Sequence, residues 1–450
     1  MRRFLISGLG ALALAAVVPV EAQTGRVSYD TFSLANGLKV ITSEDHSTPI
    51  VAVDVWYNTG SRNERPTRSG FAHLFEHMMF QGSAHVKKAE HFQLVQRAGG
   101  QSNGSTTEDR TNYFEVLPSN RLNLALWLEA DGMRSLAITD STFHNQRETV
   151  KEERRLGVDN QPYGKAFTDG LTLPYDSTTC FAYAHTVIGD MADLEAAQVA
   201  DVQAFFDTYY APNNATLVVV GDFNAAELRR LVTNYFAGIP SHPAPAPVRC
   251  EYQLSPGTLR REFSDQHANL PAVVRLYRIP SHDDADTPAL ELMNIILGQG
   301  ESSRLNVSIV RHEKAALFAG SGIVGNRRGP GTTFAFGVAN QDVSIDHVDS
   351  LLAAQLDTIR AGGITADEIA KAKSTFRSRF IETRETVLNK AEELHHYAMF
   401  HTSLADINTD LDRYLAVTND DIRRVAMKYL DPANAVILIV RPAQQAGGGQ

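Results

Sequence analysis

The sequence contains only two cysteines, Cys180 and Cys250, in 450 residues. So few cysteines exclude a disulfide framework, and their spacing lacks the clustering of a structural zinc site. Two interpretations of the pair stay open, because the thiols could form one disulfide in an oxidising compartment or remain as inert buried groups.

Long apolar runs are absent after the amino-terminal region, since no later segment approaches the about 20 apolar residues of a membrane-spanning helix. The first residues differ, because two arginines precede an apolar stretch from Phe4 to about Val20 and small residues favour a cut after Ala22. This pattern predicts a secretory signal peptide over residues 1–22 and an exported chain, periplasmic or secreted. A single membrane anchor is the alternative, which two glycines and a proline within the run disfavour.

Basic clusters are absent as well, and the formal net charge is −10. The chain has no patch that would follow a phosphate backbone, so we expect no nucleic-acid partner. With 43% hydrophobic residues, a chain of this length is too long for one core and predicts two or more domains.

Two segments 220 residues apart resemble each other, DVQAFFDTYYAPNNATLVVVGD from Asp201 and DIRRVAMKYLDPANAVILIVRP from Asp421. In each, a helical pattern ends at a proline turn and a β-branched run follows, which predicts helix, turn and strand. The repeat implies that the chain consists of two similar halves.

We therefore predict an α+β fold with two homologous domains over 25–238 and 257–443, a proline-rich linker over 239–256 and a flexible tail over 444–450. Strands are expected over 49–61, 271–279 and 332–340, and helices over 120–138, 143–156, 344–361 and 365–399. The first of these strands alternates apolar residues onto one face, which predicts a half-buried strand.

The segment GFAHLFEHMMFQGS at 70–83 places polar residues in an otherwise apolar helix. His73, Glu76 and His77 stand at i, i+3 and i+4 and share one face. A pair of satisfied core histidines bridged by the glutamate is one interpretation. The other is a bound metal ion, which would compensate the cost of three ionisable groups on an apolar face.

Zinc chemistry fits this spacing. Two histidines one turn apart can both bind Zn²⁺, and Glu76 beside them can take a proton from a water molecule. H-x-x-E-H is the inverted form of the H-E-x-x-H zinc-protease motif. A third ligand is expected from the following helical segment, where Glu153 shares a face with the apolar Val150 while Glu148 and Glu152 point to solvent.

On these residues the chain resembles the M16 family of zinc metallopeptidases, the pitrilysin and mitochondrial processing peptidase group, in its short two-domain exported bacterial form. Residues 60–83 are similar to the family's active-site helix and its lead-in. The resemblance implies one Zn²⁺ per chain, held by His73, His77 and Glu153, with Glu76 as the base. It also implies that each domain is a mainly antiparallel sheet packed with helices and that the chain forms half of a clamshell.

Two segments depart from the family pattern. QRETVKEE corresponds to the family's E-R-x-x-V-x-x-E and again selects Glu153, but its first glutamate is Gln146. In GGQSNGSTTEDRTNYFEVLP at 99–118, Gly104 replaces the usual alanine of an edge strand that pairs with the substrate backbone. The resemblance makes the following residues candidates for substrate binding: Asn103, Ser105, Thr106 and Thr107.

The second half carries no H-x-x-E-H, and TPALELMNIILGQG at 287–300 is apolar where the histidines would be. Family members of this size enclose substrate between two chains, and the enclosing half contributes an arginine and, seven residues later, a tyrosine. Here the match gives Arg311 but Phe318, which cannot donate a hydrogen bond. The resemblance therefore implies a heterodimer with a homologous subunit that lacks the zinc motif and carries the arginine and tyrosine, with a homodimer as the alternative.

The predicted function is a zinc-dependent endopeptidase that cleaves peptides or unfolded segments in an enclosed chamber, using water activated by Glu76. One alternative is a non-catalytic subunit in which the fold serves binding or assembly. Another is a domain with purely structural zinc, which metal loss would unfold.

Overall fold

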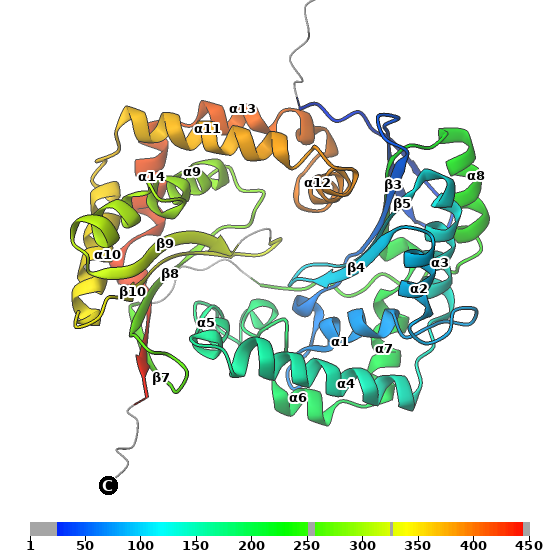
Figure 1. The fold of residues 1–450 in the computed structure, drawn as a ribbon, viewed down its shortest axis with the longest axis horizontal. Coiled ribbons are helices and arrows are strands. Elements are labelled where there is room, and N and C mark those ends of the chain that lie inside the picture. Colours follow the sequence, from blue (N-terminus) through cyan, green and yellow to red (C-terminus); the bar gives the residue numbers. More distant parts are fainter. Residues whose placement is uncertain (1–24, 251–256, 325–326, 444–450) are drawn as a thin grey trace, which may run out of the picture.

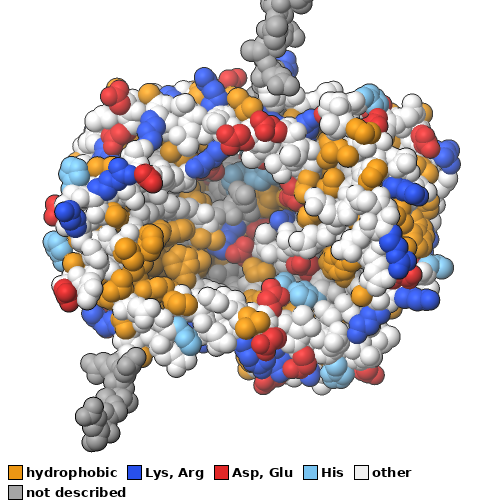
Figure 2. Space-filling view, viewed as in Figure 1, with side chains coloured by type: hydrophobic (Ala, Val, Ile, Leu, Met, Phe, Trp, Pro, Cys, Tyr) orange, Lys and Arg blue, Asp and Glu red, His pale blue; other side chains and the backbone are white. Residues whose placement is uncertain are grey.

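A computed structural model describes residues 25–250, 257–324 and 327–443. The predicted signal peptide, the end of the predicted linker and the predicted tail lie outside the described residues. The two halves of the chain stand side by side, with a sheet in each (Figure 1). Figure 2 shows a hollow in the middle of the molecule, between these halves.

The strands of the described residues form two sheets with the same core topology. They are β1 (Asp30–Ser33), β2 (Lys39–Glu44), β3 (Ile50–Tyr57), β4 (Gln101–Thr106), β5 (Thr111–Pro118), β6 (Ala215–Gly221), β7 (Leu259–Asp265), β8 (Ala272–Ile279), β9 (Ala316–Val324), β10 (Gly331–Ala339) and β11 (Val436–Pro442). The orders are β1-β2-β6-β3-β5-β4 and β7-β11-β8-β10-β9. Each sheet has one parallel pair, β2 with β6 and β7 with β11, and its other pairs are antiparallel. This confirms the predicted duplication into two mainly antiparallel sheets.

Helices pack on both sheets, as the α+β prediction requires. They are α1 (Phe71–Met79), α2 (Glu90–Arg97), α3 (Leu122–Ser135), α4 (Asp140–Arg154), α5 (Gly164–Gly170), α6 (Met191–Ala196), α7 (Val199–Tyr209), α8 (Ala225–Phe236), α9 (Thr287–Gly298), α10 (Ile345–Arg360), α11 (Ala366–Glu382), α12 (Val387–Phe400), α13 (Asp410–Ala416) and α14 (Asn419–Tyr429). In both repeats a helix, a proline turn and a strand follow one another, as α7 leads to β6 and α14 to β11. Among the described residues, no helix combines the length and the apolar character that spanning a bilayer requires.

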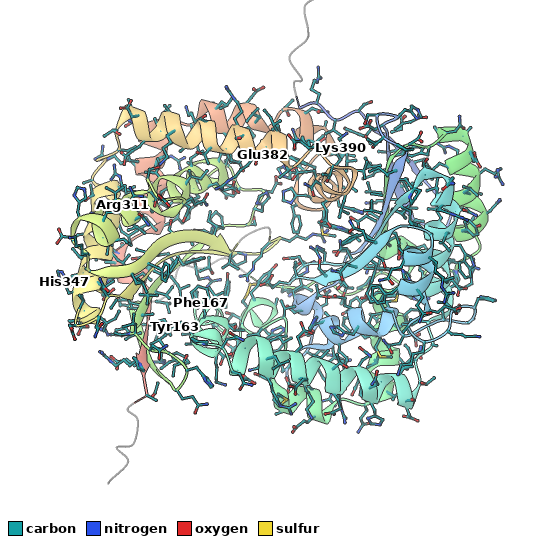
Figure 3. All side chains as sticks on the ribbon, in the orientation of Figure 1. Tyr163, Phe167, Arg311, His347, Glu382 and Lys390 are labelled. Atoms are coloured by element: carbon teal, nitrogen blue, oxygen red, sulfur yellow. A yellow bond between two sulfur atoms is a disulfide. The ribbon has the colours of Figure 1, made fainter. Side chains whose placement is uncertain are left out.

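Each half covers part of the other half's sheet. Helix α12 packs on β3 and β6, where Leu394 joins a buried apolar cluster with Ala52 and Val218. In return, Phe167 of α5 packs against the second sheet (Figure 3). The prediction of a half-buried strand is therefore wrong, because all of β3 except its first residue is buried.

The single helix predicted over 365–399 is also wrong, since two helices occupy this range. Helix α11 ends at Glu382 and α12 begins at Val387. The side chain of Thr386 accepts a hydrogen bond from the N–H of Asn389, which caps the new helix. The break turns the chain from the second half toward the first sheet. The other predicted strands and helices coincide with β8, β10, α3, α4 and α10 apart from short differences at their ends.

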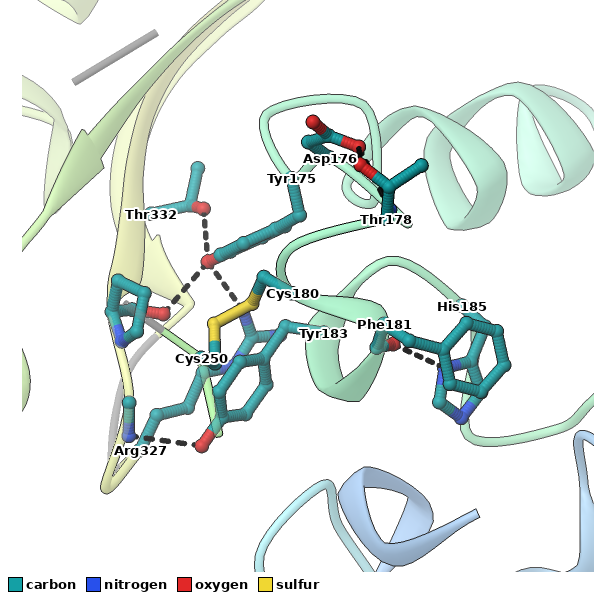
Figure 4. Close-up of a disulfide and its surroundings, with 12 residues drawn as sticks. Tyr175, Asp176, Thr178, Cys180, Phe181, Tyr183, His185, Cys250, Arg327 and Thr332 are labelled. Carbon is teal, nitrogen blue, oxygen red and sulfur yellow. Dashed lines mark hydrogen bonds between the residues drawn. A yellow bond between two sulfur atoms is a disulfide. The ribbon is translucent and has the colours of Figure 1, made fainter. Parts of the chain in front are cut away.

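Cys180 and Cys250 form a disulfide, so the structure selects one of the two interpretations that the sequence left open (Figure 4). The bond joins the segment before α6 to the region between the two halves. It lies in a small apolar cluster with the buried rings of Tyr175 and Tyr183. The disulfide thus anchors the segment between α8 and β7, which connects the two sheets.

Candidate metal centre

Helix α1 presents one face to the core and another to α4 and β4. Its apolar residues are buried in the core of the first half. His73, Glu76 and His77 are only partly buried and lie where α1 meets α4 and β4. The shared face predicted from their spacing is therefore present.

A buried carboxylate fixes the start of α1. Glu64 accepts hydrogen bonds from the N–H groups of Gly70 at 2.9 Å and Ala72 at 2.7 Å. The Nε2 atom of His185 lies 3.0 Å from Glu64 Oε2. A carboxylate at this end satisfies free N–H groups and interacts favourably with the helix dipole. No sequence pattern predicts this pair, because Glu64 lies before the first turn of α1, where acidic residues are usually enriched, and His185 is far along the chain.

The three predicted metal ligands converge between α1 and α4. Glu153 Oε2 lies 3.3 Å from His77 Nε2 and 3.7 Å from His73 Nε2. Zn²⁺ with tetrahedral bonds of about 2.0–2.2 Å holds its ligand atoms roughly 3.3 Å apart. Burial and the neighbouring His77 lower the pKa of His73 to about 4, so this ring is neutral near pH 7, as a metal ligand must be. The donor set and its spacing therefore fit a zinc ion.

The phase of α4 separates Glu153 from the neighbouring glutamates. Val150 is fully buried, and Glu153 one turn later faces α1. Glu148 pairs with Lys151 of the same helix, and Glu152 pairs with Arg155 directly after it. These two glutamates point away from the histidines.

Glu76 lies beside the histidines and is oriented by β4. The hydroxyl of Thr106 donates a hydrogen bond to Glu76 Oε2 at 2.6 Å. Burial raises the pKa of Glu76, and the Thr106 hydrogen bond opposes this rise because it stabilises the carboxylate. A carboxylate with a raised pKa is a better proton acceptor near neutral pH.

The two departures from the family pattern both lie against this centre. Gln146 Oε1 is 3.3 Å from His77 Nδ1, and the Gln146 amide nitrogen donates to Asn145 Oδ1 at 2.8 Å. The contact with Asn145 fixes the orientation of the Gln146 amide. The neutral amide oxygen therefore orients the His77 ring, whereas the family pattern has a carboxylate at this position. At Gly104, an added Cβ would lie 3.2 Å from Glu76 Cγ, which leaves little room for any side chain.

The candidate substrate residues lie on or next to β4, which is the last strand of its sheet. Asn103 is exposed on this edge. Ser105 and Thr107 are engaged with Arg110, whose Nη1 donates to Ser105 O at 2.8 Å and whose N–H donates to Thr107 Oγ1 at 3.2 Å. Of the four candidates, Thr106 alone hydrogen-bonds the predicted base.

The structure does not bring Arg311 to this centre. Arg311 lies in the helical turn η6 (Asn306–His312) of the second half (Figure 3), where its guanidinium contacts Glu301 at 2.7 Å. Phe318 on the edge strand β9 is 60% exposed. Both side chains are open to the surroundings, so a role toward another chain stays a prediction.

A duplicated α+β fold with an H-x-x-E-H helix in its first half is the combination expected of an M16 peptidase. The family model described as Insulinase (Peptidase family M16) matches residues 39–169, and the one described as Peptidase M16 inactive domain matches residues 196–376. The chain belongs to peptidase family M16.

Similar proteins cover the described fold. A Helicobacter pylori protein named zinc protease PqqE is 28% identical over 450 residues, 98% of this chain and 100% of the relative. The crystal structure of a protease from Helicobacter pylori matches with a TM-score of 0.88 and 28% identity, over 93% of this chain and 100% of that one. The periplasmic protease PqqL from Escherichia coli matches in fold, with a TM-score of 0.75 and 18% identity, over 92% of this chain and 47% of that chain. The family and the named relatives support a peptidase role in general.

Proposed function

We propose that this chain is an exported zinc endopeptidase that cleaves peptides or unfolded polypeptide segments. The observation that carries the proposal is the convergence of His73, His77 and Glu153 beside Glu76 and next to a sheet edge. Bound there, Zn²⁺ would lower the pKa of a water molecule toward about 7 and polarise the scissile carbonyl. Export rests on the predicted signal peptide.

Each side chain has its own part in this proposal. The two histidines and Glu153 hold the ion. Glu76 accepts the proton of the attacking water on its carboxylate and passes it to the leaving amine. Thr106 keeps that carboxylate oriented through the bond to Oε2.

The edge strand β4 supplies a place for the substrate backbone. A peptide that adds to this edge would form main-chain hydrogen bonds that are indifferent to side chains, and it would lie beside Glu76 because Thr106 belongs to the same strand. Only an extended segment can pair in this way. The expected substrates are therefore peptides and unfolded regions, with Asn103 as an additional contact.

Incubation with a mixed peptide library tests the proposal. The purified chain, alone and with candidate partner subunits, is assayed with and without a chelator, and Glu76→Gln serves as the matched variant. We expect cleavage that needs metal and is lost in the variant. Cleavage that survives chelation contradicts the zinc mechanism. Absence of cleavage with every partner favours the alternative of a non-catalytic binding or assembly subunit.

We further propose that the enclosing half of the chamber comes from a second, homologous subunit. Arg311 and Phe318 are exposed on the second half, and the phenylalanine cannot donate a hydrogen bond to a developing oxyanion. The match over 47% of PqqL supports such a pairing, because that longer chain has room for a second unit of this size. A homodimer is the alternative.

A further inference from the structure

A second cluster of possible metal ligands, made of three histidines, lies away from α1. His282 follows strand β8, His396 lies on α12, and His401 directly follows that helix. One ring nitrogen from each lies within 4.8 Å of the other two. The cluster therefore joins a loop of the second half to the helix that covers the first sheet.

The three rings lie close enough together to share one ion. The Nε2 atoms of His282 and His396 are 3.0 Å apart, close to the roughly 3.3 Å between two nitrogens on a tetrahedral ion. The ring centroids of the three pairs are 4.7, 5.3 and 5.3 Å apart, with interplanar angles of 78°, 74° and 67°. The rings of His73 and His77 at the candidate zinc centre are placed similarly, with a centroid distance of 4.8 Å and an interplanar angle of 88°.

Hydrogen bonding between the rings explains only part of the cluster. His282 and His396 can share one proton between their Nε2 atoms. The side chain of His401 is 2% exposed, and neither of its ring nitrogens has a hydrogen-bond partner among the described residues. The carboxylate of Asp406 lies 3.9 Å from His401 Nδ1, too far for a hydrogen bond. A buried ring with two unsatisfied nitrogens is costly, and a bound ion would remove part of that cost.

We infer that His282, His396 and His401 form a second transition-metal site, with three imidazole ligands and an open fourth position. Three neutral imidazoles suit Zn²⁺ and neighbouring divalent ions. A cavity of about 290 Å³ is lined by His282 and His396, so there is room for a water molecule beside these two rings.

The position of this site points to a role in fixing α12, the helix of the second half that covers the first sheet, to the loop after β8. The N–H of His282 donates to Arg327 O at 3.0 Å, which anchors its loop to the second half. The hydroxyl of Thr402 donates to Asp283 Oδ2 at 2.7 Å, which already joins the end of α12 to this loop. A bound ion would add a stronger link at the same place. Metal at the second site is therefore expected to stabilise the fold rather than to take part in peptide hydrolysis.

Metal stoichiometry of four matched proteins tests the inference. The wild-type chain, His77→Ala, His401→Gln and the double variant are loaded with Zn²⁺, freed of excess metal and analysed. We expect about two equivalents in the wild type, about one in each single variant and none in the double variant. His347→Gln is the control, because His347 is an exposed histidine on α10 and should keep both ions (Figure 3).

The outcomes separate the two sites. If His401→Gln loses its zinc while His77→Ala keeps the wild-type amount, the second site is supported and the assignment of the first site is wrong. One equivalent in the wild type that vanishes completely in His77→Ala overturns the inference.

A second measurement covers the case in which His401→Gln fails to fold. The His77→Ala chain is titrated with Zn²⁺ and its thermal unfolding is followed, and Co²⁺ is used as a spectroscopic probe. We expect a higher Tm and the visible absorption of tetrahedral Co²⁺. No change in either quantity would also overturn the inference.

Discussion

Helices α1 and α9 follow corresponding strands of the two sheets, β3 and β8, and differ in what they present beside those strands. Where α1 has two histidines and a glutamate, α9 has Leu290, Met293 and Asn294, all of them buried. Asn294 satisfies its amide locally, because it donates to Leu290 O at 2.9 Å and accepts from the Thr333 hydroxyl at 3.1 Å. The same topology can thus be stabilised by a helix whose residues at these positions are all packed in the core. The polar face of α1 is therefore not a requirement of the fold.

The helices that pack on α1 and α9 also differ in whether they carry a possible metal ligand. Helices α4 and α11 both begin after a capping threonine, Thr139 and Thr365. At the same distance from the cap, α4 has Glu153 and α11 has Arg379. A cation at this position cannot be a metal ligand, and residues 196–376, which include α9, match a family model described as Peptidase M16 inactive domain. At these positions the first half has residues that can bind a metal ion, whereas the second half has residues that cannot.

The largest effect is expected from Glu76→Gln, which would remove the base and leave the ligands. Loss of a general base typically costs about 10²- to 10⁴-fold in kcat. The metal content should stay at the wild-type level, whereas His77→Ala should lose the ion at this centre. Peptide turnover measured beside metal analysis checks both statements. Wild-type turnover in the glutamine variant would remove Glu76 from the mechanism.

A smaller effect is expected from Glu153→Gln. Because even outer partners of a metal site are worth about 10- to 100-fold, loss of a ligand should weaken zinc affinity and activity by at least that much. Glu152→Gln is the matched control, since Glu152 lies next to it in sequence but pairs with Arg155 at the surface. Zinc affinity measured by competition with a chelator compares the two variants. If Glu152→Gln is the more damaging one, the assigned face of α4 is wrong.

The parts that were predictable from sequence depend on local periodicity. Helical spacing alone places His73, Glu76 and His77 on one face, and the phase of Val150 alone prefers Glu153 over Glu152. The duplicated helix, turn and strand were recognisable for the same reason. Local patterns decide such features because the residues involved are close in sequence.

The parts that were missed depend on contacts between distant segments. Glu64 and His185, which fix the start of α1, are 121 residues apart. The burial of β3 on its second face comes from α12, which lies far along the chain. Whether Cys180 and Cys250 pair also depends on how the fold brings their segments together. No periodicity within a segment carries this information.

Phe318→Tyr tests whether the second half of this chain can act as the enclosing half for another copy, or whether a different subunit must do so. If the enclosing half must donate a hydrogen bond, a homodimer lacks one oxyanion donor, and restoring it could raise kcat by up to about 10²-fold. Addition of a homologous subunit with an arginine and a tyrosine should do the same for the wild-type chain. Co-purification from the native source followed by mass determination identifies such a subunit. Full activity of the isolated chain, unchanged by the substitution or by any partner, would favour the homodimer.

The smallest effect concerns a carboxylate of the second half that serves stability. Asp286, just before α9, accepts hydrogen bonds from Arg424 at 2.6 Å, Lys428 at 2.9 Å and the Tyr429 hydroxyl at 2.7 Å. Burial alone would raise the pKa of Asp286, but these donors outweigh it and bring the pKa to about 2. Asp286→Asn should lower the free energy of unfolding by about 1–2 kcal/mol at pH 7, because the two cations are half-exposed and partly screened.

The pH dependence of that loss distinguishes a charge effect from a packing defect. The folded-state pKa of Asp286 lies below its ordinary value of 3.8, so the carboxylate's contribution is complete above that value and disappears as the pH falls toward about 2. The difference in unfolding free energy between the wild type and Asp286→Asn should therefore shrink over this range in denaturant titrations. Glu301→Gln is the control, since Glu301 is 89% exposed and its substitution should change the unfolding free energy little at any pH.

Because Asp286 lies in the half without the candidate zinc centre, peptide turnover per folded molecule should remain at the wild-type level in Asp286→Asn. A stability difference that persists below pH 2 would show that Asp286 acts through packing, and a loss of turnover would contradict the division of roles between the halves.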